Sequence, residues 1–476
     1  MKVGKINVSE AIRNVEQMMQ DDASISPQVR MMLNLLVVII NMFLEKMGTN
    51  SRNSGTPPSR DPNRERGSKR KVKGEKRKPG GQNGHRGVRL EQQQNPDKIE
   101  LLEIDRRTLP AGEYRAVGFE TRQTIDIEIS KVVTEYRAEI LEDEEGNRFV
   151  AEFPAGVKSD VQYGNSVKAH AVYLSQFQLL PYDRIRDYFA NQGGIPLSAG
   201  SIFNFNKEAF NRLANFEALI KRHLIAQKLL HADETGINID GKLLWLHCAC
   251  NDKFTLFFPH TDRGGEAMKD MGVLEHFHGI LCHDHWKPYF QFTCEHVLCN
   301  AHHLRELERA WEKEDQKWAL NMQELLLEMN EATIKAEGCL KKGAAQAFRE
   351  RYRGILTQAE EECPFPAMPP GQKKRGRVAR SKSRNLLERL RHFEDQVLRF
   401  MTDPLVPFTN NQGENDLRMT KVQQKISGCF RSFEGAQIFC RVRSYLLTCQ
   451  KHDILPSAAL HLLFAGKLPD FIHNLE

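Results

Sequence analysis

Apolar side chains at helical spacing fill the first part of the chain. Over residues 8–47 they recur every three to four positions, with a polar start near Ser9 and Gly48 at the end, which predicts one long helix. Between Met31 and Leu44 they cover most faces of that helix. This favours a packed helix pair or a coiled-coil dimer, although a helix buried in its own domain has the same pattern. The apolar run of about 14 residues is too short to span a bilayer, so no membrane partner is expected.

Short alternating runs replace the helical spacing between residues 99 and 162. Thr124–Ile129 and Val132–Tyr136 alternate apolar and polar residues, as half-buried strands do, and Glu144–Asn147 has the composition of a hairpin turn. We therefore expect a small β-rich module here. It contains no cysteine and no histidine, which excludes a zinc site of the usual kind.

Helical spacing returns over residues 166–228. Pro181–Asn191 and Leu197–Leu213 are separated by a Gly-Gly pair, and Ser198 can cap the second helix. Two helices joined by a tight turn are typical of helix-turn-helix DNA binding. Plain helix pairs have the same pattern, so both interpretations stay open.

Four apolar runs after residue 228 predict one mixed sheet. The first run ends in Asp233, and Leu243–Cys250 and Phe254–Phe258 follow as antiparallel partners. The fourth run, His278–Cys282, is followed closely by Asp284. Three antiparallel strands with a fourth beside the first are the ribonuclease H-like order, which brings the two acids to neighbouring strand positions. The expected fold class is thus α/β with a ribonuclease H-like catalytic core.

A third carboxylate stands far downstream, at Glu414. Asn410 and Asn411 begin a helical run, which puts Glu414 in its first turn and Arg418 one turn later on the same face. Carboxylates are the ligands that Mg²⁺ or Mn²⁺ prefers, and two such ions can promote phosphoryl transfer while inverting the local charge for a phosphodiester. Any one of these acids alone is more often a turn residue, a cap or an ion-pair partner. Three at the ends of suitable elements predict a two-metal site.

Positive charge is concentrated in one polar segment. The chain has a net charge of +6, yet residues 51–90 alone hold 13 Lys or Arg and 3 Asp or Glu. This segment has too few large apolar residues to fold alone, so it is either a solvated linker or a flexible arm that neutralises DNA phosphates. The sign and density of its charge favour the arm. The expected phosphate-binding residues are Arg52, Lys69, Arg70, Lys71, Lys73, Lys76, Arg77 and Lys78, together with Arg418.

Cysteine usage argues for a reducing compartment. All ten cysteines lie at or after Cys248, and Met1 leads into a mixed polar helix with no secretory signal, so we expect a cytoplasmic, nucleoid-associated protein. One group of cysteines and histidines invites a zinc interpretation, but cysteines of this kind are more often buried core residues, so zinc is not expected. The group is Cys294, His296, Cys299, His302 and His303.

These motifs resemble the insertion-sequence-66 family of bacterial transposases along nearly the whole chain. The resemblance is strongest at Asp233-Glu234-Thr235, at Cys299-Asn300-Ala301-His302 and from Asn410 to Arg431. It implies a DDE catalytic triad of Asp233, Asp284 and Glu414, with His302 and Arg305 near the phosphate. It also implies a mostly helical insertion between the second and third acids, and two small accessory proteins from the same element. Further matching motifs are Asn50–Ser54, Arg77–His85, Phe153–Val157, Gln162–Gly164 and Leu179–Arg184.

Two departures from the family pattern stand out. Many members carry paired Cys-x-x-Cys motifs in the module that here spans roughly residues 99–150; this chain has none, so a zinc finger is not carried over. Thr409 stands where the family usually has an aspartate before the double asparagine.

The expected function is metal-dependent cleavage of transposon ends and strand transfer into target DNA, by a homodimer or higher oligomer on double-stranded DNA. A ribonuclease H-like nuclease or resolvase that does not join strands, and a catalytically decayed end-binding protein, are the alternatives. The expected segments are a helical or coiled-coil segment (1–48), a basic linker (49–95), the β-rich module (96–165), the helix-turn-helix-like region (166–228), the first part of the core (229–300), the helical insertion (301–405) and the second part of the core (406–476).

Overall fold

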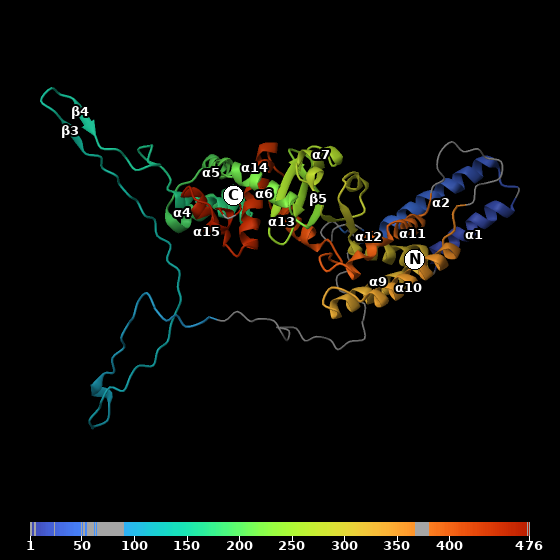
Figure 1. Cartoon of the computed structure of the whole chain (residues 1–476), viewed down its shortest axis with the longest axis horizontal. Coiled ribbons are helices and arrows are strands. Elements are labelled where there is room, and N and C mark those ends of the chain that lie inside the picture. The colour runs from blue at the N-terminus through green and yellow to red at the C-terminus, as the bar shows by residue number, and fades with distance from the viewer. Residues whose placement is uncertain are drawn as a thin grey trace.

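A computed structural model describes residues 2–3, 6–22, 24–48, 50, 53–54, 61, 63, 90–366, 380–473 and 475. A central body holds a mixed sheet and its covering helices (Figure 1). A helical lobe and the N-terminal helices lie at one end of this body, and two long projections leave the other end.

The sheet has five strands in the order β7-β6-β5-β8-β9. The first three are antiparallel neighbours, whereas β8 and β9 run parallel to β5. Asp240 and Gly241 join β5 to β6, both with positive φ (48° and 78°), as a two-residue hairpin turn requires. The predicted order of the first four strands is confirmed, and β9 adds a short fifth strand. The strands are β5 (Leu229–Ile239), β6 (Lys242–Cys250), β7 (Thr255–His260), β8 (Ile280–His283) and β9 (Glu295–Leu298).

One face of the sheet packs against helices that precede the sheet in the sequence and helices that follow it. Leu230, Ala232 and Leu281 belong to this core. The predicted helix pair is confirmed: Gly194, in the left-handed region at φ 57°, ends α4, and the Ser198 hydroxyl accepts the Ser201 amide at 2.9 Å to cap α5. The elements on this face are α3 (Asn165–Val172), η2 (Tyr173–Phe177), α4 (Tyr182–Gly193), α5 (Ala199–Arg212), α6 (Ala214–Ile225), α14 (Phe433–Lys451), α15 (Pro456–Phe464) and α16 (Asp470–His473), with α7 (Gly265–Asp270), η3 (Leu274–His276) and η4 (Lys287–Gln291) in the β7–β9 connections.

The opposite face carries Ile280 and Cys282, which pack into a second core with the helical lobe. Trp318 and Tyr352 are fully buried at the centre of this lobe. Helix α13 (Asn411–Ser427) covers the remaining part of the same face. The lobe consists of α8 (Asn300–Glu314), α9 (Lys317–Lys335), α10 (Lys342–Glu362), α11 (Lys382–His392), α12 (Glu394–Leu398) and η5 (Arg399–Met401).

The single N-terminal helix expected over residues 8–47 is wrong: two helices form, α1 (Val8–Asp21) and α2 (Pro27–Gly48), after the short strands β1 (Lys2–Val3) and β2 (Ile6–Asn7). Pro27 lacks an amide hydrogen and disfavours helical backbone at Ser26, so the helix is interrupted before Pro27 and a new helix starts there. The Ser26 hydroxyl accepts the Val29 amide at 3.4 Å.

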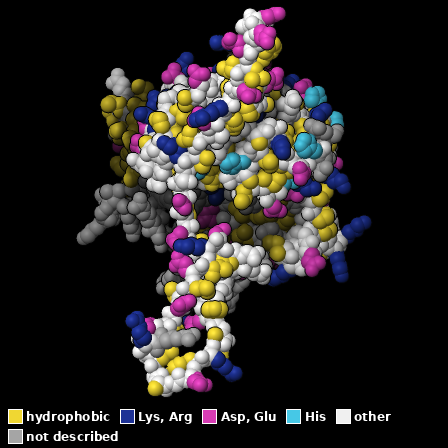
Figure 2. Space-filling view, turned by 90° about the vertical axis from the view of Figure 1, so that its left-hand side faces the viewer, with side chains coloured by type: hydrophobic (Ala, Val, Ile, Leu, Met, Phe, Trp, Pro, Cys, Tyr) yellow, Lys and Arg dark blue, Asp and Glu magenta, His cyan; other side chains and the backbone are white. Residues whose placement is uncertain are grey.

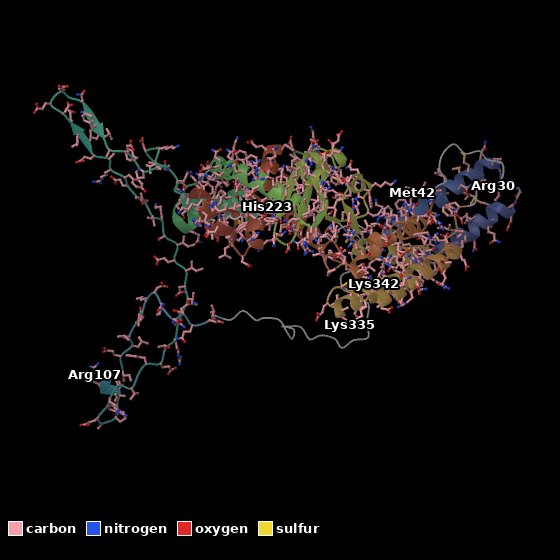
Figure 3. All side chains as sticks on the ribbon, viewed as in Figure 1. Arg30, Met42, Arg107, His223, Lys335 and Lys342 are labelled. Carbon is pink, nitrogen blue, oxygen red and sulfur yellow. The ribbon has the colours of Figure 1, made fainter. Side chains whose placement is uncertain are left out.

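Most apolar side chains of α2 are exposed, and Val37 is a buried exception. The helix is therefore not buried within its own domain. Figure 3 shows Met42 on the end of α2 nearer the body and Arg30 near its far end. The window Pro27–Leu44, with mean hydropathy 1.6, is long and apolar enough to cross a membrane, so the length argument made from the sequence does not hold. One such helix among the described residues is weak evidence, and it does not by itself imply a span.

The packed β-rich module does not form between residues 90 and 163. Only the hairpin of β3 (Ile140–Glu142) and β4 (Arg148–Val150) is present, around the predicted turn at Gly146. The strands expected at 124–129 and 132–136 are wrong, because among the described residues their apolar side chains have no partner strand or core to pack against. The rest is mostly extended chain, with η1 (Arg106–Thr108) and a turn in which the Val157 amide donates to the Pro154 carbonyl at 3.0 Å. Figure 2 shows the two projections above and below the body, with Arg107 near the tip of one in Figure 3.

Candidate active site

Asp233 lies on β5, and Asp284 directly follows the last residue of the neighbouring parallel strand β8. His231 of β5 pairs with Cys282 of β8, and each aspartate lies two residues further along its own chain. Because side chains alternate along a strand, Asp233 belongs to the sheet face that α13 covers. Repulsion from Asp284 is one of the causes that raise the pKa of Asp233, so the two acids are close enough to interact.

The third acid comes to the same place on the first turn of α13. Helix α13 begins at Asn411 with Glu414 in its first turn, as expected. This turn packs closely on β5, since a Cβ atom added at Gly413 would lie 3.5 Å from the Asp233 Cβ. The absence of a side chain at Gly413 lets the helix approach the strand.

Asn410 fixes the start of α13 against the sheet and the lobe. Its Nδ2 donates to the Ala232 carbonyl at 2.9 Å, and its Oδ1 lies 2.7 Å from the His231 Nδ1, which must then carry the proton. Its backbone N–H donates to the Cys299 Sγ at 3.1 Å. Sequence reasoning used Asn410 only as a helix start; the double asparagine was the one signal of this role.

The two aspartates lie in an unfavourable electrostatic environment for ionised carboxyls. Burial, followed by repulsion from Glu234 and Asp284, raises the pKa of Asp233 well above its ordinary value, and Glu414 adds to this. Burial and then Glu234 raise the pKa of Asp284 from 3.8 to about 6. Each aspartate accepts a backbone N–H, but within the described part of the chain no Lys or Arg forms an ion pair with either.

Glu234, which the sequence did not single out, is held on the opposite face of β5. Arg263 donates to Glu234 Oε1 at 2.6 and 2.9 Å, and the Tyr289 hydroxyl donates to Oε2 at 2.5 Å. The Arg263 guanidinium lies over Trp286 at 4.1 Å and Trp245 at 4.7 Å. Glu234 thus has the charged partner that Asp233 and Asp284 lack. Its contacts with Arg263 and Tyr289 span 29 and 55 residues of sequence, and no local sequence pattern predicts them.

His302 and Arg305, which the family resemblance implies to be near the phosphate, lie next to Glu414. The His302 Nδ1 is 3.8 Å and the Arg305 Nη2 3.7 Å from the Glu414 Oε1. Burial, with the positive charges of Arg305 and Arg389, lowers the pKa of His302 to about 4, so this imidazole is neutral at pH 7. Arg418 is exposed on α13. The remaining expected DNA-binding residues, Arg52, Lys69, Arg70, Lys71, Lys73, Lys76, Arg77 and Lys78, lie outside the described residues.

A cleft of about 350 Å³ opens beside this cluster, between α8 and α11. Four of its lining residues are cationic: Arg305, Arg309, Lys382 and Arg389. Glu306 is the only acid in the lining among the described residues, and it pairs with Arg389. Asn53 and Ser54 also line the cleft, and the Asn53 Nδ2 donates to Glu312 of α8 at 3.1 Å. Asn53 and Ser54, which directly precede the basic segment in the sequence, thus lie at the cleft.

Two sequence families match the chain. Residues 4–91 match a family of unknown function (DUF6444), and residues 160–438, more than half of the chain, match the family described as Transposase IS66 family. The second match spans all five strands of the sheet, the lobe, α13 and the three acids. No curated protein matches the chain. With the match over this length, the chain belongs to the IS66 family of transposases.

Proposed function

We propose that this transposase is a DDE enzyme that cleaves the ends of a transposon and joins them to target DNA. The observation that supports the proposal is the register of β5 and β8, in which Asp233 and Asp284 each follow a paired residue by two positions, together with the packing of the first turn of α13 on Asp233. The strand order β7-β6-β5-β8-β9 matches the ribonuclease H-like order, and the lobe lies between the second and third acids where a helical insertion is expected.

The donor set suits two hard divalent cations. Asp233 and Asp284 form no ion pair with Lys or Arg among the described residues, and burial, followed by repulsion from Glu234, raises the pKa of both, a cost of ionisation that bound cations would offset. We propose that Asp233, Asp284 and Glu414 would hold the two ions. Two bound Mg²⁺ or Mn²⁺ ions would activate the attacking oxygen and stabilise the leaving oxygen of an in-line displacement.

The protein side chains would position the DNA for two successive displacements. A water first attacks the phosphodiester at the transposon end and leaves a free 3′-hydroxyl; that hydroxyl then attacks target DNA. Arg305 beside Glu414 is placed to contact a phosphate oxygen at the site, and the neutral His302 can donate or accept a hydrogen bond there. We assign neither residue a proton-transfer step.

Binding of double-stranded DNA is proposed for the cleft and for the helix pair α4–α5. The cationic residues of the cleft suit a phosphate backbone that leads away from Glu414. The basic segment that follows Ser54 in the sequence would add further phosphate contacts. We also propose that the exposed apolar surface of α2 pairs two copies, that two small proteins of the same element assist, and that the protein acts on the bacterial nucleoid in the cytoplasm.

The test is strand cleavage and joining on DNA from the flanks of the element, with Mg²⁺ or Mn²⁺. Asp233→Asn, which keeps the size of the side chain but removes a metal ligand, is the main variant. Asp262→Asn is the matched control, because Asp262 is exposed on a loop. Joining that is lost in Asp233→Asn and kept in Asp262→Asn supports the proposal. Joining that survives in Asp233→Asn overturns the assignment of the triad, and nicking without joining would indicate a nuclease instead.

A further inference from the structure

We propose that Cys299, His302 and Glu414 form a second, softer metal site that binds Zn²⁺ and competes for the third acid. Among the described residues, one ligand atom from each lies within 4.8 Å of the other two. The Zn²⁺ binding itself does not depend on the DDE mechanism, whereas its inhibitory effect rests on the function proposed above.

The three donors come from two elements that converge at this point. Cys299 immediately precedes α8 and His302 lies in its first turn, so the Cys-x-x-His spacing puts both on one side of the helix start. Glu414 approaches from α13. The His302 Nδ1 and the Glu414 Oε1 are 3.8 Å apart, and both are buried without a hydrogen-bond partner in the part of the chain that the structure describes. Two buried polar atoms that face each other without a partner are what a bound cation would satisfy.

The zinc interpretation raised by the sequence thus changes its members. His296 lies 3.0 Å from His283, and His303 is hydrogen bonded to Asn300 at 3.0 Å. These histidines therefore have other contacts, and only Cys299 and His302 of the original group join Glu414.

The donor types select Zn²⁺ over Mg²⁺. Thiolate and neutral imidazole are soft or borderline ligands that favour Zn²⁺, Co²⁺ or Cd²⁺, whereas Mg²⁺ prefers oxygen alone. Binding converts the Cys299 thiol to thiolate and releases its proton to solvent, while His302 binds through a neutral nitrogen. Three protein donors leave a fourth tetrahedral position for water. The Asn410 N–H that now donates to the Cys299 Sγ can remain in place, because thiolates also accept hydrogen bonds.

A second cysteine group does not offer the same site. Cys248, Cys250 and Asp416 also lie close together, but the Lys451 ammonium donates a hydrogen bond of 2.7 Å to the Asp416 carboxylate and occupies the place of a cation. Arg305, at 3.7 Å from the Glu414 Oε1, is beyond hydrogen-bond distance of the proposed site's carboxylate. The group of Cys248, Cys250 and Asp416 therefore supplies an internal comparison for the test.

The binding test is a titration of the full-length protein with Co²⁺ as a spectroscopic substitute for Zn²⁺, without DNA and without Mg²⁺. The wild-type chain should bind one Co²⁺ with a thiolate-to-cobalt absorption band that added Zn²⁺ removes. Cys299→Ser keeps an acceptor for the Asn410 N–H and should lose the band. Cys250→Ser, Cys294→Ser and the exposed Cys339→Ser should keep it. No band in the wild type, or a band that survives in Cys299→Ser, overturns the proposal.

Two further measurements keep the test independent of folding and of catalysis. Glu414→Gln should retain the band and weaken Co²⁺ binding at least tenfold; unchanged affinity would remove Glu414 from the site. In the strand-cleavage assay with Mg²⁺, micromolar Zn²⁺ should inhibit the wild type, and Cys299→Ser should be less sensitive by at least tenfold. If the Co²⁺ band is present but no cleavage occurs at any Zn²⁺ level, the function proposed above fails while the metal site stands.

Discussion

Replacement of Asn410 by alanine tests whether the position of Glu414 matters, because it leaves the Glu414 carboxylate itself unchanged. The Asn410 side chain is 1% exposed and makes two hydrogen bonds, one to the Ala232 carbonyl and one with His231. Alanine removes both and leaves two buried polar atoms without a partner, at about 1–3 kcal/mol each. Because the two losses share one small cavity, we expect the free energy of unfolding to fall by about 2–4 kcal/mol.

Among molecules of Asn410→Ala that stay folded, the rate of strand cleavage should still fall. Asn410 holds the residue that precedes α13, and a shift of about 1 Å in a catalytic group can cost about a hundredfold in rate. We expect strand cleavage by Asn410→Ala to fall about a hundredfold under conditions where circular dichroism shows the chain folded. The assays are urea unfolding and single-turnover cleavage with Mg²⁺.

Asn411→Ala is the matched control, because Asn411 is exposed at the first position of α13. Its stability should stay within about 0.5 kcal/mol of the wild type, with cleavage unchanged. Equal effects of the two variants on stability would refute the role given to the Asn410 side chain. Loss of stability without loss of cleavage in folded Asn410→Ala would refute the positioning argument alone.

Three further outcomes follow from the same contacts. Without divalent metal, the raised pKa of Asp284 means that the folded chain binds more protons than the unfolded chain between about pH 4 and 6. The free energy of unfolding should therefore fall as pH rises through that window. Asp284→Asn should remove this fall and gain about 2 kcal/mol at pH 7 in EDTA, measured by urea unfolding. Asp416→Ala, which leaves the largely buried Lys451 without its carboxylate, should lose about 3 kcal/mol, against less than about 0.5 kcal/mol for Glu331→Ala in an exposed pair with Lys335; equal losses would contradict this. Lys382→Gln in the cleft should weaken DNA binding and reduce the slope of log affinity against log salt by about 1, while Lys335→Gln should leave it unchanged.

The sequence predicted the local parts of the site well. Apolar runs that precede Asp233 and Asp284, and the polar start of the helix before Glu414, are signals within a few residues of each acid. The expectation that the first strand ends at Asp233 is wrong, because β5 continues to Ile239 as a hairpin with β6. The structure has β5, β8 and α13 where those signals lie. Such signals hold because a strand or helix start depends mainly on its neighbours in the chain.

The contacts that hold the site were not predictable from one sequence. Arg263 and Tyr289 reach Glu234 across long stretches of chain, and nothing near either residue marks it as a partner. The failed β-rich module shows the converse: residues 124–129 alternate correctly but find no neighbouring strand, and alternation alone does not make a sheet. The break before Pro27 had a clear local signal, which the helical periodicity around it outweighed.

The candidate site combines repelling acids with a neutral scaffold. In the absence of metal, burial and the neighbouring Glu234 raise the pKa of both Asp233 and Asp284, and Asp284 also raises the pKa of Asp233, so ionisation of the two aspartates is costly. The bonds that hold the site together come from uncharged groups around Asn410, which ties α13 to the sheet and to Cys299 of the lobe. An uncharged scaffold keeps its strength whether or not cations are bound, whereas an ion pair to the acids would compete with them. We therefore expect bound metal to stabilise the folded chain without a large rearrangement of α13, because the ligands are already assembled.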